Sequence, residues 1–478
     1  MRPEKASDHR DLLRELREAY REYAPVSADL NRRAEAVLVD GGSHALRLMD
    51  PFPPRIASAR GAWVYDEDGH QVLDFWQGHC GNILGHNPDA VAGRLAAAFS
   101  QGQGLQVGLT DRLQVEVAEL ICRTTATERV GLTTSGTLAT MYATMLARAF
   151  AGRDLIIKIG GGWHGGQPWG LKGVGFRLDG SGFDHADSGG LSQGVIDNVL
   201  LTRYNDPDML ENQFREFGDE VAGMIVEPFI GGGGSIPATQ EYLTTARRLT
   251  ERCGAVLILD EVISGYHFRA GDLGALYGIQ ADLITLGKMV GGGMPVAAVA
   301  GRADIMSLAV RAGTVGGNEV RFSGGTYSGH PASLMAAKAA LEYLIDHENE
   351  VYPRIFALGQ SLRRRVESAF AGEGIYAWCS GGATEYDALP GSPLFRIHFP
   401  YAVGRQLVCP DEVFDPAICD VALRTSVVPL ALLLENVHVM QGHGMVTAAH
   451  SEEHLDVLED ACRRVAHRIS VSEERQAD

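Results

Sequence analysis

Short apolar runs alternate with amphipathic stretches through the middle of the chain. Each run is rich in β-branched residues and is bounded by turn residues, which is the pattern of strands covered on both faces of a sheet. The stretches between them have helical spacing, as at residues 111–124, 240–252 and 332–346. This alternation predicts an α/β large domain whose mostly parallel sheet is covered by helices. The predicted strands are residues 155–159, 224–227, 256–260, 283–286 and 296–300.

The N-terminal part of the chain has a different pattern. Residues 8–38 carry apolar side chains at helical spacing on a surface rich in Arg and Glu, so they predict helix. Two short apolar strands flank Asp68-Gly69, a dipeptide that favours a tight turn. They predict a β-hairpin over residues 59–75.

The pattern changes again after about residue 346. It predicts a long charged helix over residues 350–371, a strand over residues 394–399 and a C-terminal helix that begins after Ser451. We therefore expect a smaller α+β domain, built from the N- and C-terminal segments. The expected division is an N-terminal helix and hairpin segment, a large ligand-binding domain and a C-terminal small domain, at residues 1–85, 86–345 and 346–478.

Composition narrows the classes of function. The net charge of −18 argues against a nucleic acid or an anionic membrane as partner. No apolar run approaches the length of a membrane span, and the charged N-terminus lacks the apolar region of a secretion signal. The seven cysteines form no CxxC pair, and the histidines near the C-terminus lack metal-site spacing. We therefore predict a cytoplasmic protein with reduced thiols and no bound metal.

The polar residues with chemical potential follow predicted strands. Asp260 ends VLILD, Glu227 ends MIVE, and Lys288 follows LITL. A Gly-rich run that contains Trp163 and His164 follows the strand LIIKI. Because ligands of open α/β sheets bind outside the carboxyl ends of the strands, these residues predict a single site.

The surroundings of Lys288 favour a reactive amine. The residue lies between an apolar run and three glycines, which would keep its amino group partly desolvated. A desolvated lysine is a nucleophile suited to Schiff-base chemistry. The simpler alternative is an ordinary lysine in an exposed loop.

Three neighbouring features each have two interpretations. Ser135-Gly136-Thr137 opens a predicted helix, so it is either a phosphate cradle of free N–H groups or a plain N-cap. The spacing of a Walker P-loop is absent. Asp260 is either an N-cap or a carboxylate that stabilises a protonated pyridine nitrogen. Trp163 either covers one face of such a ring or fills the Gly-rich turn.

Several ordered motifs carry a family resemblance. They are LDEVISGY, DLITLGKMVGGGMPVAAVAGRADIM, TTSGTLAT and FSGGTYSGHPA, together with the hairpin and the ILGHNPDAV that follows it. Between about residues 40 and 465 the chain resembles a class III aminotransferase of the type I pyridoxal-phosphate fold. It is most similar to the branch of glutamate-1-semialdehyde aminomutase and β-amino-acid aminotransferases.

The resemblance implies a pyridoxal 5′-phosphate cofactor. Lys288 would form a Schiff base with it and move the proton of the reaction, and Asp260 would pair with the pyridinium nitrogen. Val262 would pack under the ring, and Trp163 would stack on it where the family usually has Tyr. The other implied cofactor-binding residues are Ser135, Gly136, Thr137, His164 and Glu227.

The resemblance also implies a homodimer, in which Thr326 reaches the phosphate of the neighbouring subunit's cofactor. Substrate recognition departs from the family pattern. His44 occupies the position of a carboxylate-binding arginine, although Arg47 lies close by, and Ile230 with glycines follows the Glu-Pro pair. NVHVMQGHGMVTAAH has no arginine where some members bind a carboxylate. These departures suggest a substrate other than a standard β-amino acid.

The expected activity is transfer of an amino group between a small-molecule amino donor and a carbonyl acceptor. An intramolecular aminomutase is the main alternative, because it would complete both half-reactions on one substrate. Another pyridoxal-phosphate reaction, such as decarboxylation or racemisation, and a non-catalytic scaffold are the remaining alternatives.

Overall fold

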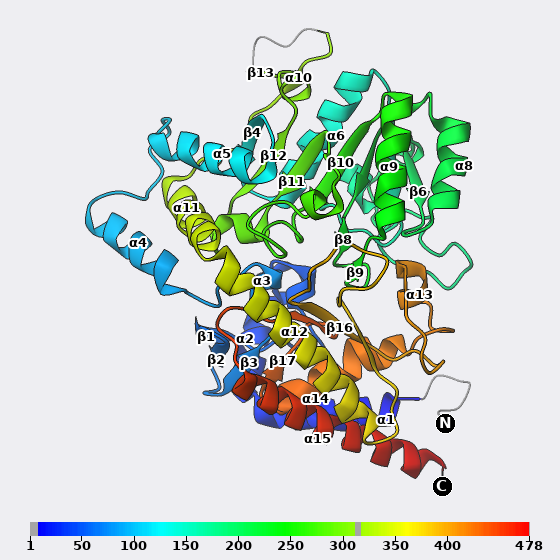
Figure 1. The fold of residues 1–478 in the computed structure, drawn as a ribbon. Helices are drawn as coiled ribbons and strands as arrows, with labels where there is room; N and C mark the ends of the chain where they lie inside the picture. Colours follow the sequence, from blue (N-terminus) through cyan, green and yellow to red (C-terminus); the bar gives the residue numbers. More distant parts are fainter. Residues whose placement is uncertain (1–7, 311–316, 478) are drawn as a thin grey trace.

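In the computed structural model, which describes residues 8–310 and 317–477, a seven-stranded sheet lies at the centre of one half of the molecule (Figure 1). Within the described residues, β12 is the one strand of this sheet that runs opposite to the other six. The predicted α/β class is confirmed. In order across the sheet, the strands are β4 (Arg129–Thr133), β12 (Ala297–Gly301), β11 (Leu283–Leu286), β10 (Val256–Glu261), β7 (Val221–Val226), β5 (Leu155–Ile159) and β6 (Val199–Thr202).

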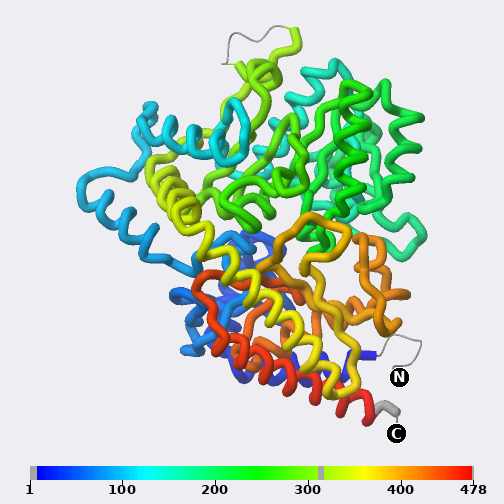
Figure 2. The backbone as a smooth tube through the Cα atoms, in the orientation of Figure 1, coloured from blue at the N-terminus to red at the C-terminus, as the bar shows by residue number. Residues whose placement is uncertain are grey.

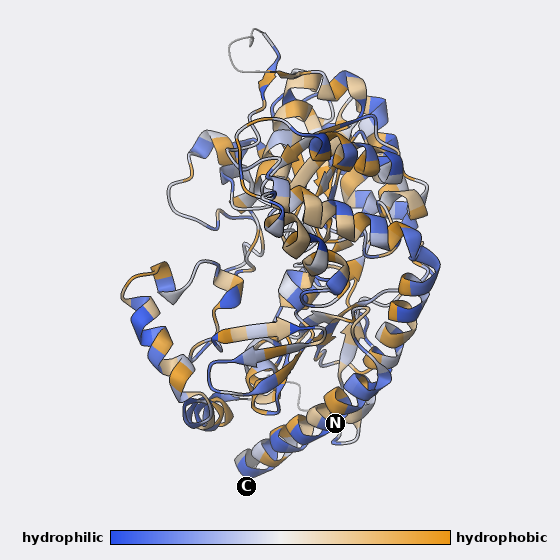
Figure 3. Cartoon of the chain, turned by 90° about the vertical axis from the view of Figure 1, so that its left-hand side faces the viewer, coloured by the Kyte–Doolittle hydropathy of each residue, from blue (hydrophilic) through white to orange (hydrophobic). Residues whose placement is uncertain are grey.

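Alternate residues of the strands face opposite helical layers. In β10, Val256 and Ile258 pack with α6 (Gly136–Ala151), whereas Leu257 and Leu259 belong to the core that contains α9 (Gln240–Cys253). Both faces are covered, so the strands are mostly apolar, and Figure 3 shows hydrophobic residues in this part of the molecule. The α9 core also includes residues of α5 (Arg112–Thr125), α8 (Pro207–Phe217) and α11 (Pro331–Asp346).

The N-terminal segment forms two helices instead of one continuous helix over residues 8–38. α1 (Arg10–Tyr23) ends before Ala24, and α2 (Pro25–Glu35) begins with Pro25 in its first turn. Proline has no N–H to continue α1, but its fixed φ suits the first position of a new helix.

The predicted hairpin is confirmed and belongs to a larger sheet. β2 (Trp63–Asp66) pairs antiparallel with β3 (Gln71–Asp74), and β1 (Ile56–Arg60) adds to its edge. On the other side, β17 (Val437–His438) pairs parallel with β3. The hairpin is therefore completed by a strand from the far end of the chain.

The C-terminal segment contains the predicted helix, strand and helix. α15 begins directly after Ser451, as its sequence predicts. The main elements are α12 (Glu348–Ala371), β15 (Trp378–Ser380), β16 (Leu394–His398), β18 (His443–Met445) and α15 (Glu452–Ala477). Shorter elements elsewhere are α4 (Asp89–Ser100), α7 (Gln193–Asp197), β8 (Phe229–Ile230), β9 (Ile236–Pro237), α10 (Ala303–Met306), β13 (Ala309–Val310), β14 (Val320–Arg321), α13 (Pro410–Phe414) and α14 (Val428–Leu434).

The two ends of the chain share one hydrophobic core. Leu16 of α1 and Val72 of β3 belong to the same buried cluster as Leu362 of α12 and Leu458 of α15. Figure 2 shows the blue N-terminal part of the tube beside the orange and red C-terminal part. No helix in the described part of the chain is both long and apolar enough to span a bilayer.

Asp74, at the end of β3, connects these segments through its carboxylate. It is 3% exposed and lies 2.7 Å from His86 Nε2 and 2.8 Å from His438 Nδ1. It also accepts hydrogen bonds from the backbone N–H groups of Trp76 and Gln77, both at 2.9 Å. Burial raises the pKa of the carboxyl, but the hydrogen bonds from His438 and His86 outweigh it and hold the pKa well below its ordinary value.

Substituting Asp74→Asn should lower the free energy of unfolding by on the order of 3 kcal/mol, because it leaves buried partners unsatisfied. Since the folded pKa is depressed, the contribution of Asp74 is complete above about pH 4, the pKa of an unfolded aspartate, and is lost as the pH falls below it. Urea unfolding at several pH values measures both effects. Asp29→Asn, which removes an exposed carboxylate paired with Arg32, should leave stability unchanged. An equally small effect at position 74 would contradict the assigned role.

Candidate active site

The carboxyl ends of the parallel strands meet at one edge of the sheet. Asp260 is the next-to-last residue of β10, Glu227 follows β7, and Lys288 begins the short 3₁₀ helix η5 (Lys288–Gly291) after β11. All three line a cavity of about 380 Å³. The position of the cavity agrees with the general placement of ligands in open α/β sheets.

Most residues predicted for the site line this cavity. Ser135 instead lines an adjoining cavity of about 800 Å³, which shares Lys288 with the first. Thr326 lines neither of these two cavities and is exposed. The predicted residues that line the first cavity are His44, Arg47, Gly136, Thr137, Trp163, His164, Glu227, Asp260, Val262 and Lys288.

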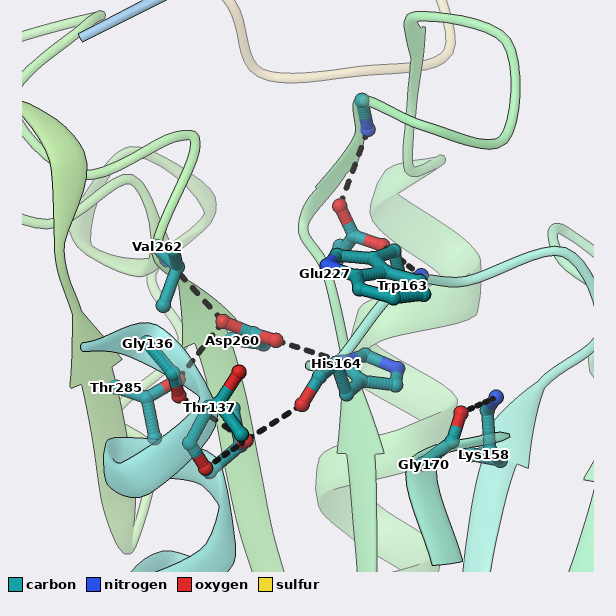
Figure 4. Close-up of polar contacts among 12 residues, drawn as sticks. Gly136, Thr137, Lys158, Trp163, His164, Gly170, Glu227, Asp260, Val262 and Thr285 are labelled. Carbon is teal, nitrogen blue, oxygen red and sulfur yellow. Dashed lines mark hydrogen bonds and ion pairs between the residues drawn. The ribbon is translucent and has the colours of Figure 1, made fainter. Parts of the chain in front are cut away.

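Asp260 and His164 form a buried pair (Figure 4). Asp260 is 3% exposed, and its Oδ2 lies 2.6 Å from His164 Nδ1. Its Oδ1 accepts hydrogen bonds from Thr285 Oγ1 at 2.8 Å and from the N–H of Val262 at 3.2 Å. A carboxylate has about four acceptor positions on its two oxygens. Three are occupied by these contacts, so one remains for a ligand.

His164 is held as a neutral imidazole. Burial lowers its pKa, although the hydrogen bond to Asp260 opposes this effect. A carboxylate only accepts, so Nδ1 donates to Asp260 and Nε2 is the unprotonated nitrogen. Within the described residues this Nε2 is buried and has no hydrogen-bond partner. An unsatisfied polar atom of this kind, beside the cavity, suits a site that receives a polar ligand.

Glu227 lies next to this pair and is protonated at neutral pH. Burial raises the pKa of its carboxyl to about 8, and the charge of Asp260 adds to the effect. Its two oxygens lie 3.3 Å from the backbone N of Trp163 and 3.1 Å from that of Gly231. The side chain of Trp163 is 42% exposed, so its indole is available to contact a ligand in the cavity.

Lys288 has both a strained backbone and a perturbed amine. Its φ is +44°, in the region that L-residues rarely occupy. Burial lowers the pKa of its ammonium group, and the charges of Asp260, Cys80 and Glu227 oppose this shift. The unprotonated and therefore nucleophilic form is thus more populated than in an exposed lysine.

The N-terminus of α6 provides a place for an anion. Ser135 is its N-cap and accepts a hydrogen bond from the N–H of Leu138 at 3.3 Å. Gly136 and Thr137 are in the first turn, where backbone N–H groups have no intrahelical acceptor. A Cβ at Gly136 would lie 2.9 Å from Val262 Cγ1, so a larger residue would clash there. The N-cap and phosphate-cradle interpretations are therefore compatible.

His44 and Arg47 lie on the short 3₁₀ helix η2 (Ala45–Arg47) and at its N-cap. Arg47 Nε donates to His79 Nε2 at 3.0 Å, and the rings of His44 and His79 lie 4.7 Å apart. Burial lowers the pKa of His79 to about 3, and the nearby His44, Arg47 and Lys288 contribute. His79 is therefore a neutral acceptor that orients Arg47.

Several lining residues are absent from the sequence-based prediction. Arg396 is a polar residue inside the apolar run LFRIHF, and this exception to the strand pattern was the available signal. The other residues have no comparable local signal. They include Trp76, His79, Cys80 and His443. Among the described residues, no three His, Cys, Asp or Glu side chains are grouped to hold a metal ion.

Comparisons with known proteins agree with this geometry. The chain matches the family model for class III aminotransferases over residues 47–373. It is 34% identical over 379 residues to glutamate-1-semialdehyde 2,1-aminomutase of Halorubrum lacusprofundi, which covers 78% of this chain and 79% of that protein.

Solved structures give the same result. An omega-transaminase from Sphaerobacter thermophilus superposes with a TM-score of 0.83 at 28% identity, covering 94% of this chain and 99% of the other. A transaminase with pyridoxal phosphate bound superposes with a TM-score of 0.80 at 29% identity, with the same coverage. The resemblance identified from the motifs and the type I fold are confirmed.

Replacing Glu227 by Gln should change how stability depends on pH. The folded pKa of about 8 lies above the ordinary value of 4.5, so wild-type protein should lose stability as the pH rises between these values. The Glu227→Gln protein should not show this loss. Urea unfolding without added cofactor measures the difference. Glu211→Gln, at an exposed carboxylate paired with Arg248, is the control. Parallel pH profiles for wild type and Glu227→Gln would show that Glu227 is ionised instead.

Proposed function

This chain belongs to the class III aminotransferases, a family of pyridoxal-phosphate enzymes, and we propose that it moves an amino group from an amino donor to a separate carbonyl acceptor. Lys288 is the proposed attachment residue for the cofactor. One observation carries the proposal: adjacent parallel strands bring the Lys288 amine and the Asp260 carboxylate to one cavity, beside the N-terminus of α6. These are the groups that a phosphorylated pyridine aldehyde requires.

When bound, pyridoxal phosphate supplies an aldehyde that condenses with amines and a ring that accepts electrons from the bond being broken. Asp260 would keep the ring nitrogen protonated, because opposite charges stabilise each other. His164 and Thr285 hold the Asp260 carboxylate at 2.6 Å and 2.8 Å, so it is already oriented. The neutral state of His164 leaves the negative charge of Asp260 for the ring.

Lys288 would also carry the proton. A half-buried amine with a lowered pKa can accept a proton from the substrate carbon and return it at a different position. Lys288 has a positive φ and begins η5 shortly after the end of β11. Val262 and Trp163 would cover the two faces of the ring, and Glu227 would lie beside it as a neutral carboxyl.

Ser135, Gly136 and Thr137 would bind the phosphate through the free N–H groups of the first turn of α6. We propose a homodimer in which the partner's Thr326 completes this site. Exposed apolar side chains near Thr326 support an interface, since Leu105 is 72% and Tyr327 is 61% exposed. Gln106 Nε2 donates to the Thr326 carbonyl at 2.9 Å and joins the two segments. A monomer in light scattering at micromolar concentration would contradict the dimer.

The organisation of the chain has a corresponding proposal. Residues 86–345 would act as the cofactor-binding domain, and residues 1–85 and 346–478 as one small domain. The shared core of the two terminal segments supports this division. All seven cysteines are free, which supports a reducing compartment such as the cytoplasm.

Lys288→Ala should abolish covalent attachment of the cofactor and reduce amino transfer by on the order of 10³-fold or more. In wild type, borohydride treatment with pyridoxal phosphate should modify the peptide that contains Lys288, as read by mass spectrometry. Lys158 provides a matched control, because it is a buried lysine whose pKa burial lowers to about 7. Its peptide should remain unmodified. Modification at Lys158 but not at Lys288 would overturn the assignment.

An intramolecular aminomutase is the second candidate, favoured by the 34% identity to the Halorubrum lacusprofundi enzyme. For two-substrate transfer, the pyridoxal form of the enzyme should bleach with a donor alone and recover only when a carbonyl acceptor is added. Spectroscopy with a panel of amines and keto acids measures this. Isomerisation of a single substrate in the absence of any second donor would favour the aminomutase instead.

A further inference from the structure

We propose that Arg396 binds the carboxylate of the amino donor and of the matching keto acid, so that the enzyme acts on amino acids. The inference rests on the proposed amino transfer. It goes beyond that function by naming the substrate class and the residue that recognises it.

Arg396 is a buried arginine that faces the reaction site. It lies in the middle of β16, is 4% exposed, and lines the same cavity as Lys288. Its Nη1 donates to the Gly232 carbonyl at 2.8 Å, and its Nε donates to the Gln441 carbonyl at 3.3 Å. These two carbonyls orient the planar guanidinium without neutralising its charge.

The charge of Arg396 has no anionic counterpart in the described part of the chain. No carboxylate there lies within ion-pair distance of the guanidinium. Burial lowers the pKa of Arg396 to about 9, Arg424 acts in the same direction, and the opposing groups are the thiols of Cys419 and Cys80. Buried charges in proteins are normally paired, so an unpaired cation at a cavity indicates an anionic ligand.

The two carboxyl groups of the cavity do not fill this role. Asp260 is occupied by His164, Thr285 and the N–H of Val262. Glu227 has a pKa of about 8 and is therefore neutral near pH 7. The cavity thus keeps a net positive end at Arg396.

The other buried arginines of the C-terminal segment, Arg363 and Arg424, have different surroundings. Arg363 also donates to carbonyl groups, those of Ser392 and Leu394, but it does not line the Lys288 cavity, and Glu367 acts on its charge. Arg424 lies near Asp420 and is likewise outside the lining of the cavity. Arg396 alone among these three combines burial, an open side and the absence of a carboxylate.

A carboxylate suits this position better than a larger anion. The guanidinium fork matches the two oxygens of a carboxylate. His443, the direct cross-strand neighbour of Arg396, lines the cavity as well, and burial holds its pKa well below the ordinary value. The N–H of this neutral imidazole can donate a hydrogen bond to an oxygen of a ligand that Arg396 also binds. The first turn of α6 remains the site for the cofactor phosphate.

The adjoining cavity suggests the rest of the substrate. Its volume is about 800 Å³, and it meets the first cavity at Lys288. Its lining includes the apolar side chains of Leu48, Met49, Ile56 and Leu433. An amino acid with an apolar side chain would therefore place its carboxylate at Arg396, its amine at Lys288 and its side chain in this second cavity.

The test measures binding of 3-phenylpropionate to the pyridoxal-phosphate-loaded protein by isothermal titration calorimetry. This probe has the carboxylate and an apolar group but no amine. Arg396→Gln should weaken its binding on the order of 100-fold, because the probe loses a buried charged partner. Arg396→Lys should lose part of the affinity, because it keeps the charge without the fork. Arg363→Gln, which removes a buried arginine outside the cavity, should bind like wild type.

Four results would overturn the inference. If wild-type protein does not bind the probe, there is no carboxylate site. If Arg396→Gln and Arg396→Lys proteins bind the probe as tightly as wild type does, Arg396 does not form that site. A loss confined to Arg47→Gln would place the carboxylate at Arg47. Loss of pyridoxal-phosphate affinity in Arg396→Gln, with probe binding unchanged, would assign Arg396 to the cofactor phosphate. Thermal melts show whether each variant is folded. Partial binding by Arg396→Lys shows that the loss in Arg396→Gln comes from the missing charge and not from misfolding.

Kinetics then separate this inference from the proposed function. The KM for L-phenylalanine should rise strongly in Arg396→Gln, whereas the KM for 2-phenylethylamine, which lacks the carboxylate, should not change. Probe binding requires no turnover, so a protein that binds 3-phenylpropionate but transfers no amino group would contradict the proposed function alone. Transfer from amines with no preference for the carboxylate would contradict the inference alone.

Discussion

The parallel register of β10 and β11 is the constraint on which the site depends. Asp260 pairs with Thr285 and Glu261 with Leu286, so the chain reaches Lys288 just beyond the sheet edge. Side chains alternate along a strand, and Asp260 therefore faces the cavity. Glu261 faces away, where its carboxylate accepts hydrogen bonds from two backbone N–H groups at 2.6 Å and 2.9 Å. A shift of one residue would turn Asp260 to the opposite face and away from the cavity.

Burial then decides which groups near Lys288 are charged. It keeps His164 neutral and Glu227 protonated, and it favours the unprotonated amine of Lys288. The charged side chains that remain in the lining of the cavity are few: Asp260, Arg47 and Arg396. A water-poor site with few charges makes each remaining interaction stronger, which suits a reaction that depends on moving a proton.

The N-terminal segment contributes to the site through a strained turn. Gln77, Gly78, His79 and Cys80 all have positive φ, and such a conformation costs roughly 1–2 kcal/mol for each non-glycine residue. Asp74 stabilises the start of this turn through two backbone N–H groups. The turn directs His79 toward Arg47 and brings Cys80 within 3.6 Å of the His443 ring. This turn therefore places His79 and Cys80 beside Arg47 and His443 at one cavity.

The sequence by itself determined the α/β class, five of the seven strands of the central sheet and the residues at the ends of those strands, because apolar runs, glycines and caps are local signals. The edge strands β4 and β6 were not predicted. Lys288, Asp260 and the Ser135 N-cap could all be located from such signals. Only the tertiary structure showed that Arg396 lines the same cavity as Lys288, that His79 orients Arg47 and that Glu227 is neutral. The physical reason is that cross-strand neighbours, burial and pKa depend on the pairing of segments far apart in the chain, as with β3 and β17, and no local pattern encodes that pairing.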